Sequence, residues 1–530
     1  MVWRAEDPQG EENAKVMWEI VRYTRGLVLD IGCGPHKTFP HFIGIDNRVD
    51  TRLFGIQMDP DLTVPDASEL PLIASDSVDA VFSSHLLEHI EDHEKALREW
   101  WRVIKPGGYL ILYLPDKDLY PNIGKEGANP DHKHDFERDD IIHAMHDIGH
   151  WTLLRNEQRS EDREYSFFQV FQKRTDGRHV FAEDQPKKLA VVVRYGAFGD
   201  AIQSAPIFAE LKRQGYFVRA HVVNMSHEVL KHDPNIDEFV IQDRDQVPNA
   251  WLPWFFEYWE KHSAKFINLS GITEQTMLSQ PTMPSWRWSH EARRALVGNV
   301  NYVEQMALTA GLKVRARDQR FWATLEERNW AHQQLDKITG TGKLICISMS
   351  GSAVHKAWPH IDIIIARILL EFPKWRIALL GGTYDQILET GWEKEERVWK
   401  LAGRISIREA MALAQVATVC MGAETGVMNA VAFEEKVAKI LFMSHSSIAN
   451  LPRDWLNTCA MVPPPTVHCY PCHMLHTGFD RCWRDDATGV AMCQAQISPD
   501  DVWQAFLVAT GRQKRGGDGA EPERLLQRTG

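Results

Sequence analysis

Polar residues beside a glycine-rich turn form the first group that could do chemistry. Residues 27–35 read LVLDIGCGP, a strand-like run that ends in a turn holding Gly32 and Gly34. Glycines there let the backbone approach a ligand without a Cβ clash. Asp46 ends the next strand-like run, FIGIDN, and a carboxylate in that place can accept both hydroxyls of a ribose. This order predicts a nucleoside site.

Asp200 stands in a similar place later in the chain. Residues 189–215 read as a strand, a glycine loop and a helix, and Asp200 lies where that helix begins. An aspartate there could act on a bound ligand. It could equally cap the helix, which is worth about 1 kcal/mol. The residues leave both roles open.

Further polar groups follow the strand-like runs of the next segment. Lys356 lies in a polar loop, Gly381 and Gly382 end a second run, and residues 424–426 form a turn before a helix-like run. Backbone N–H groups at the start of a helix suit a diphosphate. These positions predict a region that binds an anionic ligand.

Four cysteines gather near the C-terminus: Cys469, Cys472, Cys482 and Cys493. Four thiolates can bind zinc tetrahedrally, but the last two are loosely spaced and flanking histidines blur the choice of ligands. A disulfide and free thiols are the alternatives. We favour a structural loop with free thiols.

The elements that must position these groups form three successive strand and helix patterns, which predict parallel sheets covered by helices on both faces. We expect an α/β fold with a Rossmann-like domain at 1–174, a polar linker at 175–188, and two more Rossmann-like domains at 189–335 and 336–510. The charged, Gly-rich tail at 511–530 is expected to be disordered.

Composition narrows the function classes. The chain has 530 residues and a formal net charge of −12, which weighs against non-specific nucleic-acid binding, since that draws on Lys and Arg. No run of about 18 apolar residues is present, so we expect no integral membrane segment. The N-terminus is polar and acidic, unlike a secretory signal. We expect the protein to be cytoplasmic, and to associate with the inner face of the membrane if its acceptor is lipid-linked.

Residues 27–115 contain LDIGCGP, GIDN, DASELPLIASDSVDAVFSSHLLEHI and ALREWWRVIKPGGYLILYLP in that order. The segment resembles class I S-adenosylmethionine-dependent methyltransferases, and the resemblance covers most of 11–174. It implies S-adenosylmethionine as cofactor, with Asp30, Gly32 and Gly34 bordering its methionine end, Asp46 holding the ribose, and Asp66 with Ala67 beside it at the adenine. His36 stands where the family often has another glycine.

The methyl acceptor is less clear from the residues. His85, Glu88 and His89 follow the expected fourth strand and would face the cleft. A hydroxyl acceptor benefits from a general base, and we take His85 as that base, the alternative being a histidine that caps a helix or lines the cleft.

A run of histidines beyond this region could hold a metal: His132, His134, His143, His146 and His150. The segment resembles the ordinary stretch before the last helix and strand of the methyltransferase family, so we expect no metal there.

Residues 189–507 contain RYGAFGDAIQSAP, HKAWP, LLGG, LAGRISIREA and GAETGVMNAVA. They resemble glycosyltransferase family 9, the heptosyltransferase family. The resemblance implies a GT-B fold of two Rossmann-like domains and inverting sugar transfer without a catalytic metal. It also implies Asp200 as general base, and a donor site of Lys356, Gly381, Gly382, Glu424, Thr425, Gly426 and Asn429.

The turn departs from the family, which usually has Asp-Thr-Gly-Pro-Met-His where this chain has Glu424 to Asn429. The Glu424 and Asn429 side chains, which replace Asp and His, can still form hydrogen bonds, but the identity of the donor is in doubt. ADP-heptose is the family default, not a conclusion for this chain.

We therefore predict a bifunctional transferase that uses S-adenosylmethionine and a nucleotide-sugar, with a glycan or lipid-linked glycan acceptor, in synthesis of a bacterial surface glycan or lipopolysaccharide. The alternative is a methyltransferase joined to a non-catalytic, glycan-binding GT-B scaffold. Modification of nucleic acid is a poorer third, because no basic stripe with interleaved aromatics is present.

Overall fold

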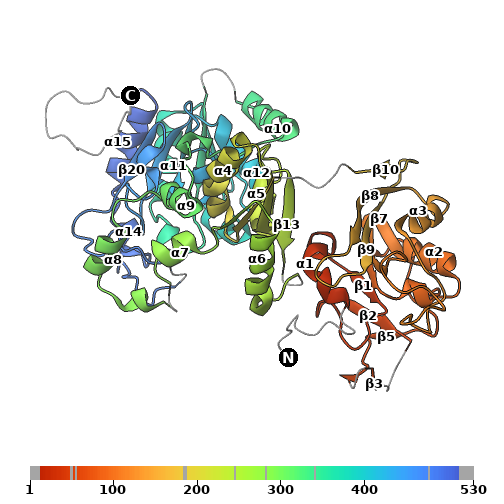
Figure 1. Cartoon of the computed structure of the whole chain (residues 1–530). Helices are drawn as coiled ribbons and strands as arrows, with labels where there is room; N and C mark the ends of the chain where they lie inside the picture. Colours follow the sequence, from red (N-terminus) through yellow and green to blue (C-terminus); the bar gives the residue numbers. More distant parts are fainter. Residues whose placement is uncertain are drawn as a thin grey trace. The chain divides into compact units, whose positions relative to one another are not determined.

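The structure is a computed structural model that describes residues 12–47, 52–53, 56–182, 188–243, 246–280, 283–338, 342–475 and 478–512. The chain divides into two compact units (Figure 1). Unit 1 comprises residues 1–187 and 240–262, and unit 2 comprises 188–239 and 263–530. The expected disordered tail, apart from Gly511 and Arg512, lies outside the described residues.

Unit 1 is built on an eight-stranded sheet of order β10-β8-β9-β7-β6-β1-β2-β5. Only β9 runs antiparallel to its neighbours. The strands are β1 (Val28–Ile31), β2 (Ile43–Asp46), β5 (Leu62–Thr63), β6 (Val78–Ser84), β7 (Ile104–Pro115), β8 (Trp151–Arg159), β9 (Ser166–Lys173) and β10 (Val180–Phe181). A separate antiparallel pair is β3 (Arg52–Leu53) and β4 (Ile56–Gln57). Strand β10 lies inside the segment predicted as a linker.

The helices of unit 1 are α1 (Met17–Ile20), α2 (His93–Val103), α3 (Arg138–His146) and α6 (Leu252–Lys261). Helix α2 begins where the Asp92 carboxylate accepts the Lys95 N–H at 3.0 Å, a standard N-cap. Its buried residues recur at helical spacing and include Leu97 and Trp100, so one face packs into the core. In Figure 1, α2 and α3 lie together beside the sheet.

Helix α6 carries the aromatic segment WLPWFFEYWE and belongs to unit 1, although it follows the first strands of unit 2 in the sequence. Phe255 and Trp259 are buried. The Phe255 ring lies 5.9 Å from that of Trp18, and the Trp251 ring lies 6.0 Å from that of Phe39. One face of the aromatic run, with Phe255 and Trp259, is thus part of a core, as large apolar rings favour.

Two sheets belong mainly to unit 2: in the first, β11 is parallel to β12 and β14, while β13 at its edge extends past residue 239; in the second, all neighbouring strands are parallel. The first has the order β13-β12-β11-β14, and the second has the order β17-β16-β15-β18-β19-β20. The strands are β11 (Leu189–Arg194), β12 (Phe217–Val223), β13 (Glu238–Gln242), β14 (Lys265–Asn268), β15 (Leu344–Ser348), β16 (Arg376–Leu380), β17 (Val398–Lys400), β18 (Val419–Ala423), β19 (Ala438–Phe442) and β20 (Thr458–Met461). The predicted α/β fold with parallel sheets is confirmed.

The helices of unit 2 are α4 (Phe198–Arg213), α5 (Asn224–Leu230), α7 (Ile272–Thr276), α8 (His290–Val297), α9 (Tyr302–Ala310), α10 (Leu325–Asp336), α11 (Ile361–Glu371), α12 (Ile407–Val416), α13 (Gly426–Ala430), α14 (Met492–Ala495) and α15 (Pro499–Ala509). Helix α11 buries Ile364, Ile365 and Ile368 in the core. Across the described part of the chain, no helix is long and apolar enough to cross a membrane.

The packing of α6 generates a stability prediction. Replacing Phe255 by Ala removes a buried ring, which costs about 3 to 5 kcal/mol. We expect hydrogen exchange to speed up in peptides from β1 and β6 but not in peptides from β15 and β18. The matched control is Trp254→Ala, because Trp254 lies on the same helix and is 37% exposed. Faster exchange in the β15 and β18 peptides alone would contradict the assignment of α6 to unit 1.

Candidate functional site

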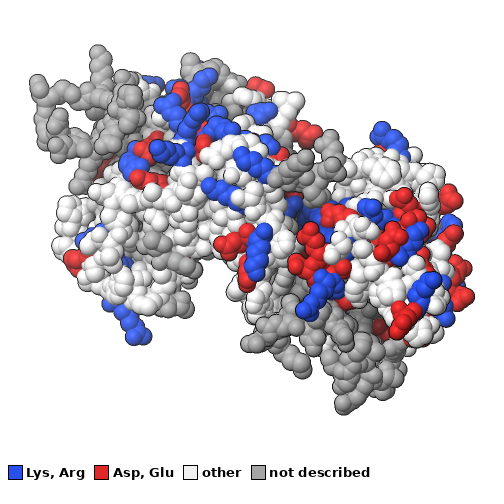
Figure 2. All heavy atoms as spheres, in the orientation of Figure 1, with Lys and Arg blue, Asp and Glu red and all other residues white. Residues whose placement is uncertain are grey.

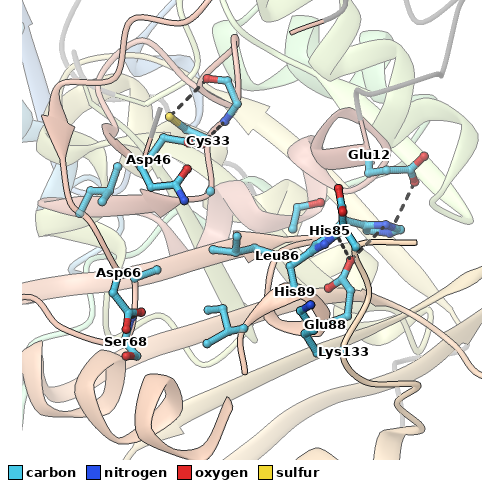
Figure 3. Close-up of a pocket in the computed structure, with 18 of the residues that line it drawn as sticks. Glu12, Cys33, Asp46, Asp66, Ser68, His85, Leu86, Glu88, His89 and Lys133 are labelled. Atoms are coloured by element: carbon cyan, nitrogen blue, oxygen red, sulfur yellow. Dashed lines mark hydrogen bonds and ion pairs between the residues drawn. The ribbon is translucent and has the colours of Figure 1, made fainter. Parts of the chain in front are cut away.

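A cleft of about 1030 Å³ lies in unit 1 at the carboxyl ends of β1, β2 and β6 (Figure 3). All six residues predicted to bind the cofactor line it: Asp30, Gly32, Gly34, Asp46, Asp66 and Ala67. The residues predicted on the acceptor side, His85, Glu88 and His89, line the same cleft. The structure therefore brings together residues from four separate segments of the sequence.

The glycine turn after β1 is held against β2. The Gly32 N–H donates to the Ile45 carbonyl at 2.8 Å, and the Gly34 N–H donates to the Asp46 carboxylate at 3.2 Å. Gly32 has a φ of +76°, and a Cβ there would lie 2.8 Å from the Leu86 side chain. Only glycine meets both conditions without strain.

The carboxylates at this end of the cleft are fixed by backbone donors. Asp66 accepts the Ser68 N–H at 2.8 Å, and the Trp100 indole donates to the Ala67 carbonyl at 2.9 Å. Asp30 is only 2% exposed and accepts the Thr38 N–H at 2.8 Å. Burial raises the pKa of Asp30 to about 6. Asp30 therefore also anchors the segment that follows the glycine turn.

His85 lies at the other end of the cleft from Asp46 and Asp66 (Figure 3). It has a φ of +49°, an uncommon conformation for a non-glycine residue that marks a constrained position. Its Nε2 lies 2.9 Å from the Ser166 hydroxyl and 3.6 Å from Glu12 Oε2. Burial, reinforced by the nearby charge of Lys15, lowers the pKa of His85 to about 3. The ring is therefore uncharged at neutral pH.

Glu88 is fully buried at the centre of a histidine group. Its Oε1 lies 3.9 Å from His85 Nδ1, 3.8 Å from His89 Nε2 and 3.9 Å from His132 Nε2. Neither carboxylate oxygen has a hydrogen-bond partner among the residues the structure describes. Burial raises the pKa of Glu88 to about 8.

The five histidines after residue 131 do not act as one group. His132 joins Glu88 and His89, and the His134 Nε2 bonds the Ile90 carbonyl at 3.0 Å. His146 and His150 pack against the ring of His179. The pairing of His132 with Glu88 was not predicted from the sequence, because the two residues lie in different segments that only the fold joins.

The predicted base of unit 2, Asp200, lies in the first turn of α4. Its carboxylate accepts the Ala197 N–H at 2.9 Å and lies 3.2 Å from Arg194 Nη2. Arg194 is completely buried and also pairs with Glu274 at 3.1 Å. Arg194 was not predicted from the sequence, although its place directly before the glycine loop was an available signal. Ala197, not Asp200, is the N-cap residue of α4; Asp200 lies in its first turn, bonds the N–H of Ala197 and carries a paired charge.

The turn that leads into α13 packs against the start of α4. A Cβ on Gly426 would lie 2.7 Å from the Phe198 Cβ, so this approach requires glycine. The Thr425 hydroxyl lies 3.1 Å from the Ser348 hydroxyl, and a Cβ on Gly351 would lie 2.6 Å from the Lys356 side chain. The loops after β11, β15 and β18 are therefore close neighbours.

Glu424 and Asn429 are both turned into the protein. Glu424 Oε2 lies 2.7 Å from His445 Nδ1, and Glu424 Oε1 accepts the Ser444 N–H at 3.0 Å. The Asn429 amide oxygen accepts from Gln203 at 3.0 Å and from Gln319 at 3.2 Å. These two side chains predicted at the donor site are engaged within unit 2.

The Asp385 side chain packs against the two glycines, Gly381 and Gly382, that follow β16. The Gly382 N–H donates to Asp385 Oδ2 at 2.7 Å, and a Cβ on Gly381 would collide with that carboxylate. The other carboxylate oxygen of Asp385 accepts the Ser350 hydroxyl. The Gly381–Gly382 turn is thereby tied to the loop that carries Lys356.

The four clustered cysteines carry no disulfide. Cys469, Cys482 and Cys493 belong to one small apolar cluster with Val467 and Phe479. Among the described His, Cys, Asp and Glu residues, the group whose ligand atoms come within 4.8 Å of one another is Glu88, His89 and His132, without a cysteine. The zinc prediction therefore stays a prediction.

Comparisons with known proteins match a segment in each of the two units. Residues 29–112 match the model of a methyltransferase domain, and residues 280–438 match that of glycosyltransferase family 9 (heptosyltransferase). No curated protein matches the chain.

Several solved structures are similar to parts of the chain. A glycosyl transferase family 9 protein from Veillonella parvula is 15% identical, with a TM-score of 0.45, over 63% of this chain and 100% of that one. The E. coli ADP-heptose heptosyltransferase II is 15% identical, with a TM-score of 0.41, over 61% and 99%. A SAM-dependent methyltransferase from Archaeoglobus fulgidus is 17% identical, with a TM-score of 0.25, over 30% and 92%.

The buried carboxylate of Glu424 generates a pH prediction. Burial by itself would raise its pKa, but His445 and the Ser444 N–H outweigh burial and hold the pKa below its usual 4.5. Such a group stabilises the fold above pH 4.5, and this contribution is lost as the pH falls through the lowered pKa.

We expect the Glu424→Gln variant to lower the free energy of unfolding of unit 2 at neutral pH by about 1 to 3 kcal/mol, and to lose this acid-sensitive component. The free energy of unfolding is measured by urea titration above and below pH 4.5. Hydrogen exchange in β18 and β19 reports the local stability of unit 2. Glu435→Gln is the control, since that side chain is 74% exposed. An unchanged acid response in Glu424→Gln would contradict this role of Glu424.

Proposed function

We propose that this chain, which carries a methyltransferase domain and a domain of glycosyltransferase family 9, is a bifunctional enzyme of surface glycan synthesis. One site would transfer a methyl group from S-adenosylmethionine, and the other a sugar from a nucleotide-sugar, with ADP-heptose as the family default. The observation that supports methyl transfer is the cleft of unit 1 lined by all six predicted cofactor residues, and the one that supports sugar transfer is Asp200 paired with buried Arg194.

In the methyltransferase site, each part of the cofactor is assigned to a group of residues that lines the cleft. The glycine turn with Asp30 would border the methionine end, Asp46 would accept the ribose hydroxyls, and Asp66 with Ala67 would meet the adenine. The turn supports this because it exposes backbone at Gly34, where a Cβ would meet nothing within 4 Å. Close approach of backbone to ligand is the usual reason for such glycines.

Methyl transfer is an in-line displacement, so much of the rate comes from positioning. His85 is the proposed base: it would accept the proton of an acceptor hydroxyl as the oxygen attacks the methyl carbon, while the methyl–sulfur bond breaks and S-adenosylhomocysteine leaves. Its uncharged ring can accept a hydrogen bond, although general bases work best when their pKa lies near the operating pH. We therefore propose that His85 also orients the acceptor.

In the glycosyltransferase site, Asp200 is the proposed general base. It would take the proton of the acceptor hydroxyl while that oxygen attacks the sugar carbon and the nucleotide diphosphate departs from the opposite side. Lys356, with Gly381, Gly382, Thr425 and Gly426, would hold the diphosphate, a task that suits a compact cation. The pairing of Asp200 with buried Arg194 supports this, because it fixes the carboxylate where three loops meet.

A second candidate is a methyltransferase joined to a non-catalytic glycan-binding scaffold. One observation favours it: Glu424 and Asn429, which were expected at the donor, are bonded to His445, Gln203 and Gln319. In that case unit 2 would bind a glycan without turnover.

Small-molecule donors and a glycan or lipid-linked glycan acceptor are the proposed ligands, in the cytoplasm or at the inner membrane face. On the face shown in Figure 2, basic and acidic side chains are interspersed over unit 1. Ion pairs such as Lys95–Glu69 and Arg98–Glu94 illustrate this mixture. Nucleic-acid binding favours a basic stripe instead.

For the cysteine cluster we propose a structural loop, with zinc as the alternative.

Cofactor binding can be tested with S-adenosylhomocysteine by calorimetry. We expect Asp46→Asn to weaken its binding about 10- to 100-fold, because hydrogen bonds to a charged group are worth about 1.5 to 3 kcal/mol. Asp147→Asn is the matched control, since its side chain is 81% exposed. Equal affinity in wild type and Asp46→Asn would refute the proposed ribose contact.

Sugar transfer can be tested by titrating ADP, UDP, GDP and CMP and assaying their sugars. We expect one of these nucleotides to bind. Lys356→Ala should lower the affinity for that nucleotide by about 10- to 100-fold, because the variant loses a charge-assisted contact. We expect Asp200→Asn to keep nucleotide binding but lower turnover by at least about 100-fold, the usual share of a general base. Arg213→Gln, on the same helix and 33% exposed, should leave both unchanged. Binding without turnover in the wild type would favour the scaffold.

A further inference from the structure

We propose that Glu88, His89 and His132 bind a divalent transition-metal ion in the methyltransferase cleft. The ligand atoms of these three residues all lie within 4.8 Å of one another. All three residues line the same cleft as the predicted cofactor residues. Their proposed role, to hold the acceptor, rests on the proposed methyltransferase function, but metal binding itself does not.

The carboxylate of Glu88 is the first feature that points to a cation. It is fully buried, yet neither oxygen has a hydrogen-bond partner among the described residues. Burying a carboxylate without a partner is costly, so such groups are normally paired or ligate a metal. Three histidine nitrogens surround Oε1 at 3.8 to 3.9 Å, beyond hydrogen-bond distance. A cation among them would satisfy the acid.

The gap between the ligand atoms has a suitable size for such an ion. Bonds of about 2.1 Å to a tetrahedral ion place neighbouring ligand atoms about 3.4 Å apart. Glu88 Oε1 lies 3.8 Å from His89 Nε2 and 3.9 Å from His132 Nε2. The three ligand atoms lie within 4.8 Å of one another, so inward rotation of these side chains would bring all three to one ion.

The backbone holds the two ligand-bearing segments in register. The Lys133 N–H donates to the Glu88 carbonyl at 2.7 Å, and the His134 Nε2 bonds the Ile90 carbonyl at 3.0 Å. Figure 3 shows Lys133 beside Glu88 and His89. His132 itself is 8% exposed. The ligands are therefore presented by a built site rather than by mobile surface side chains.

The donor set indicates which ion binds. Two imidazoles and one carboxylate suit Zn²⁺, Fe²⁺ or Co²⁺ better than Mg²⁺ or Ca²⁺, which prefer oxygen ligands. Three protein ligands leave at least one position open. Because the group lines the cleft, the open position can take an oxygen of the acceptor. The acceptor class is therefore one with a hydroxyl or carboxylate that can ligate a metal.

Co²⁺ titration of the full-length chain, followed by visible absorption, tests the site. We expect wild type to bind one Co²⁺ whose bands lack thiolate charge transfer, which separates this ion from any ion at the four cysteines. Glu88→Gln and His132→Gln should weaken that Co²⁺ by at least about 100-fold, because loss of even an outer partner of a ligand costs about 10- to 100-fold. His146→Gln is the matched control, since its side chain is 66% exposed.

Binding of S-adenosylhomocysteine by the same variants reports the fold and separates two kinds of failure. If Co²⁺ binds without thiolate bands and S-adenosylhomocysteine does not bind, the metal site stands and the methyltransferase proposal fails. If Co²⁺ shows only thiolate bands, or binds equally to wild type, Glu88→Gln and His132→Gln, the metal proposal is overturned. Should Glu88→Gln lose S-adenosylhomocysteine binding through misfolding, His132→Gln decides the question alone.

Discussion

Parallel strands end on the same edge of a sheet, and both candidate sites depend on this constraint. In unit 1, the glycine turn follows β1, Asp46 ends β2 and His85 follows β6. In unit 2, the loop of Lys356 follows β15 and Glu424 follows β18. Residues far apart in the chain become neighbours because their strands are paired in parallel register. This edge is where ligands bind in open α/β sheets.

The hydrogen bonding of buried polar groups then determines which side chains at each sheet edge are available to a ligand. Around Asp46 and Asp66, backbone donors satisfy the carboxylates and leave a shaped cleft. Around Glu88, the protein supplies no hydrogen-bond donor among the described residues, and the carboxylate is left to the neighbouring histidines. In unit 2 the situation is reversed, because Glu424 is fully engaged by His445 and Ser444. The same residue type is thus buried without a hydrogen-bond partner among the described residues in one unit and fully engaged in the other.

The residue patterns predicted the α/β class. Together with the resemblance to methyltransferases, they also predicted six residues that line the cleft of unit 1, such as Gly32 in the turn after β1 and Asp46 at the end of β2. They were not sufficient for pairings that only the fold creates. His132 with Glu88, Arg194 with Glu274 and His445 with Glu424 are all separated by many residues. The place of α6 in unit 1 is likewise created by the fold: Phe255 packs on Trp18, and Trp251, directly before the helix, packs on Phe39, although unit 2 strands precede both.

The central claim is that one chain holds two separate ligand sites, one in each unit. Calorimetry on a single sample tests it most directly: the chain is saturated with S-adenosylhomocysteine and then titrated with ADP, UDP, GDP and CMP in turn. We expect one equivalent of S-adenosylhomocysteine and then one equivalent of a single nucleotide with undiminished affinity. Competition between the two ligands, or the absence of S-adenosylhomocysteine binding, would contradict the claim.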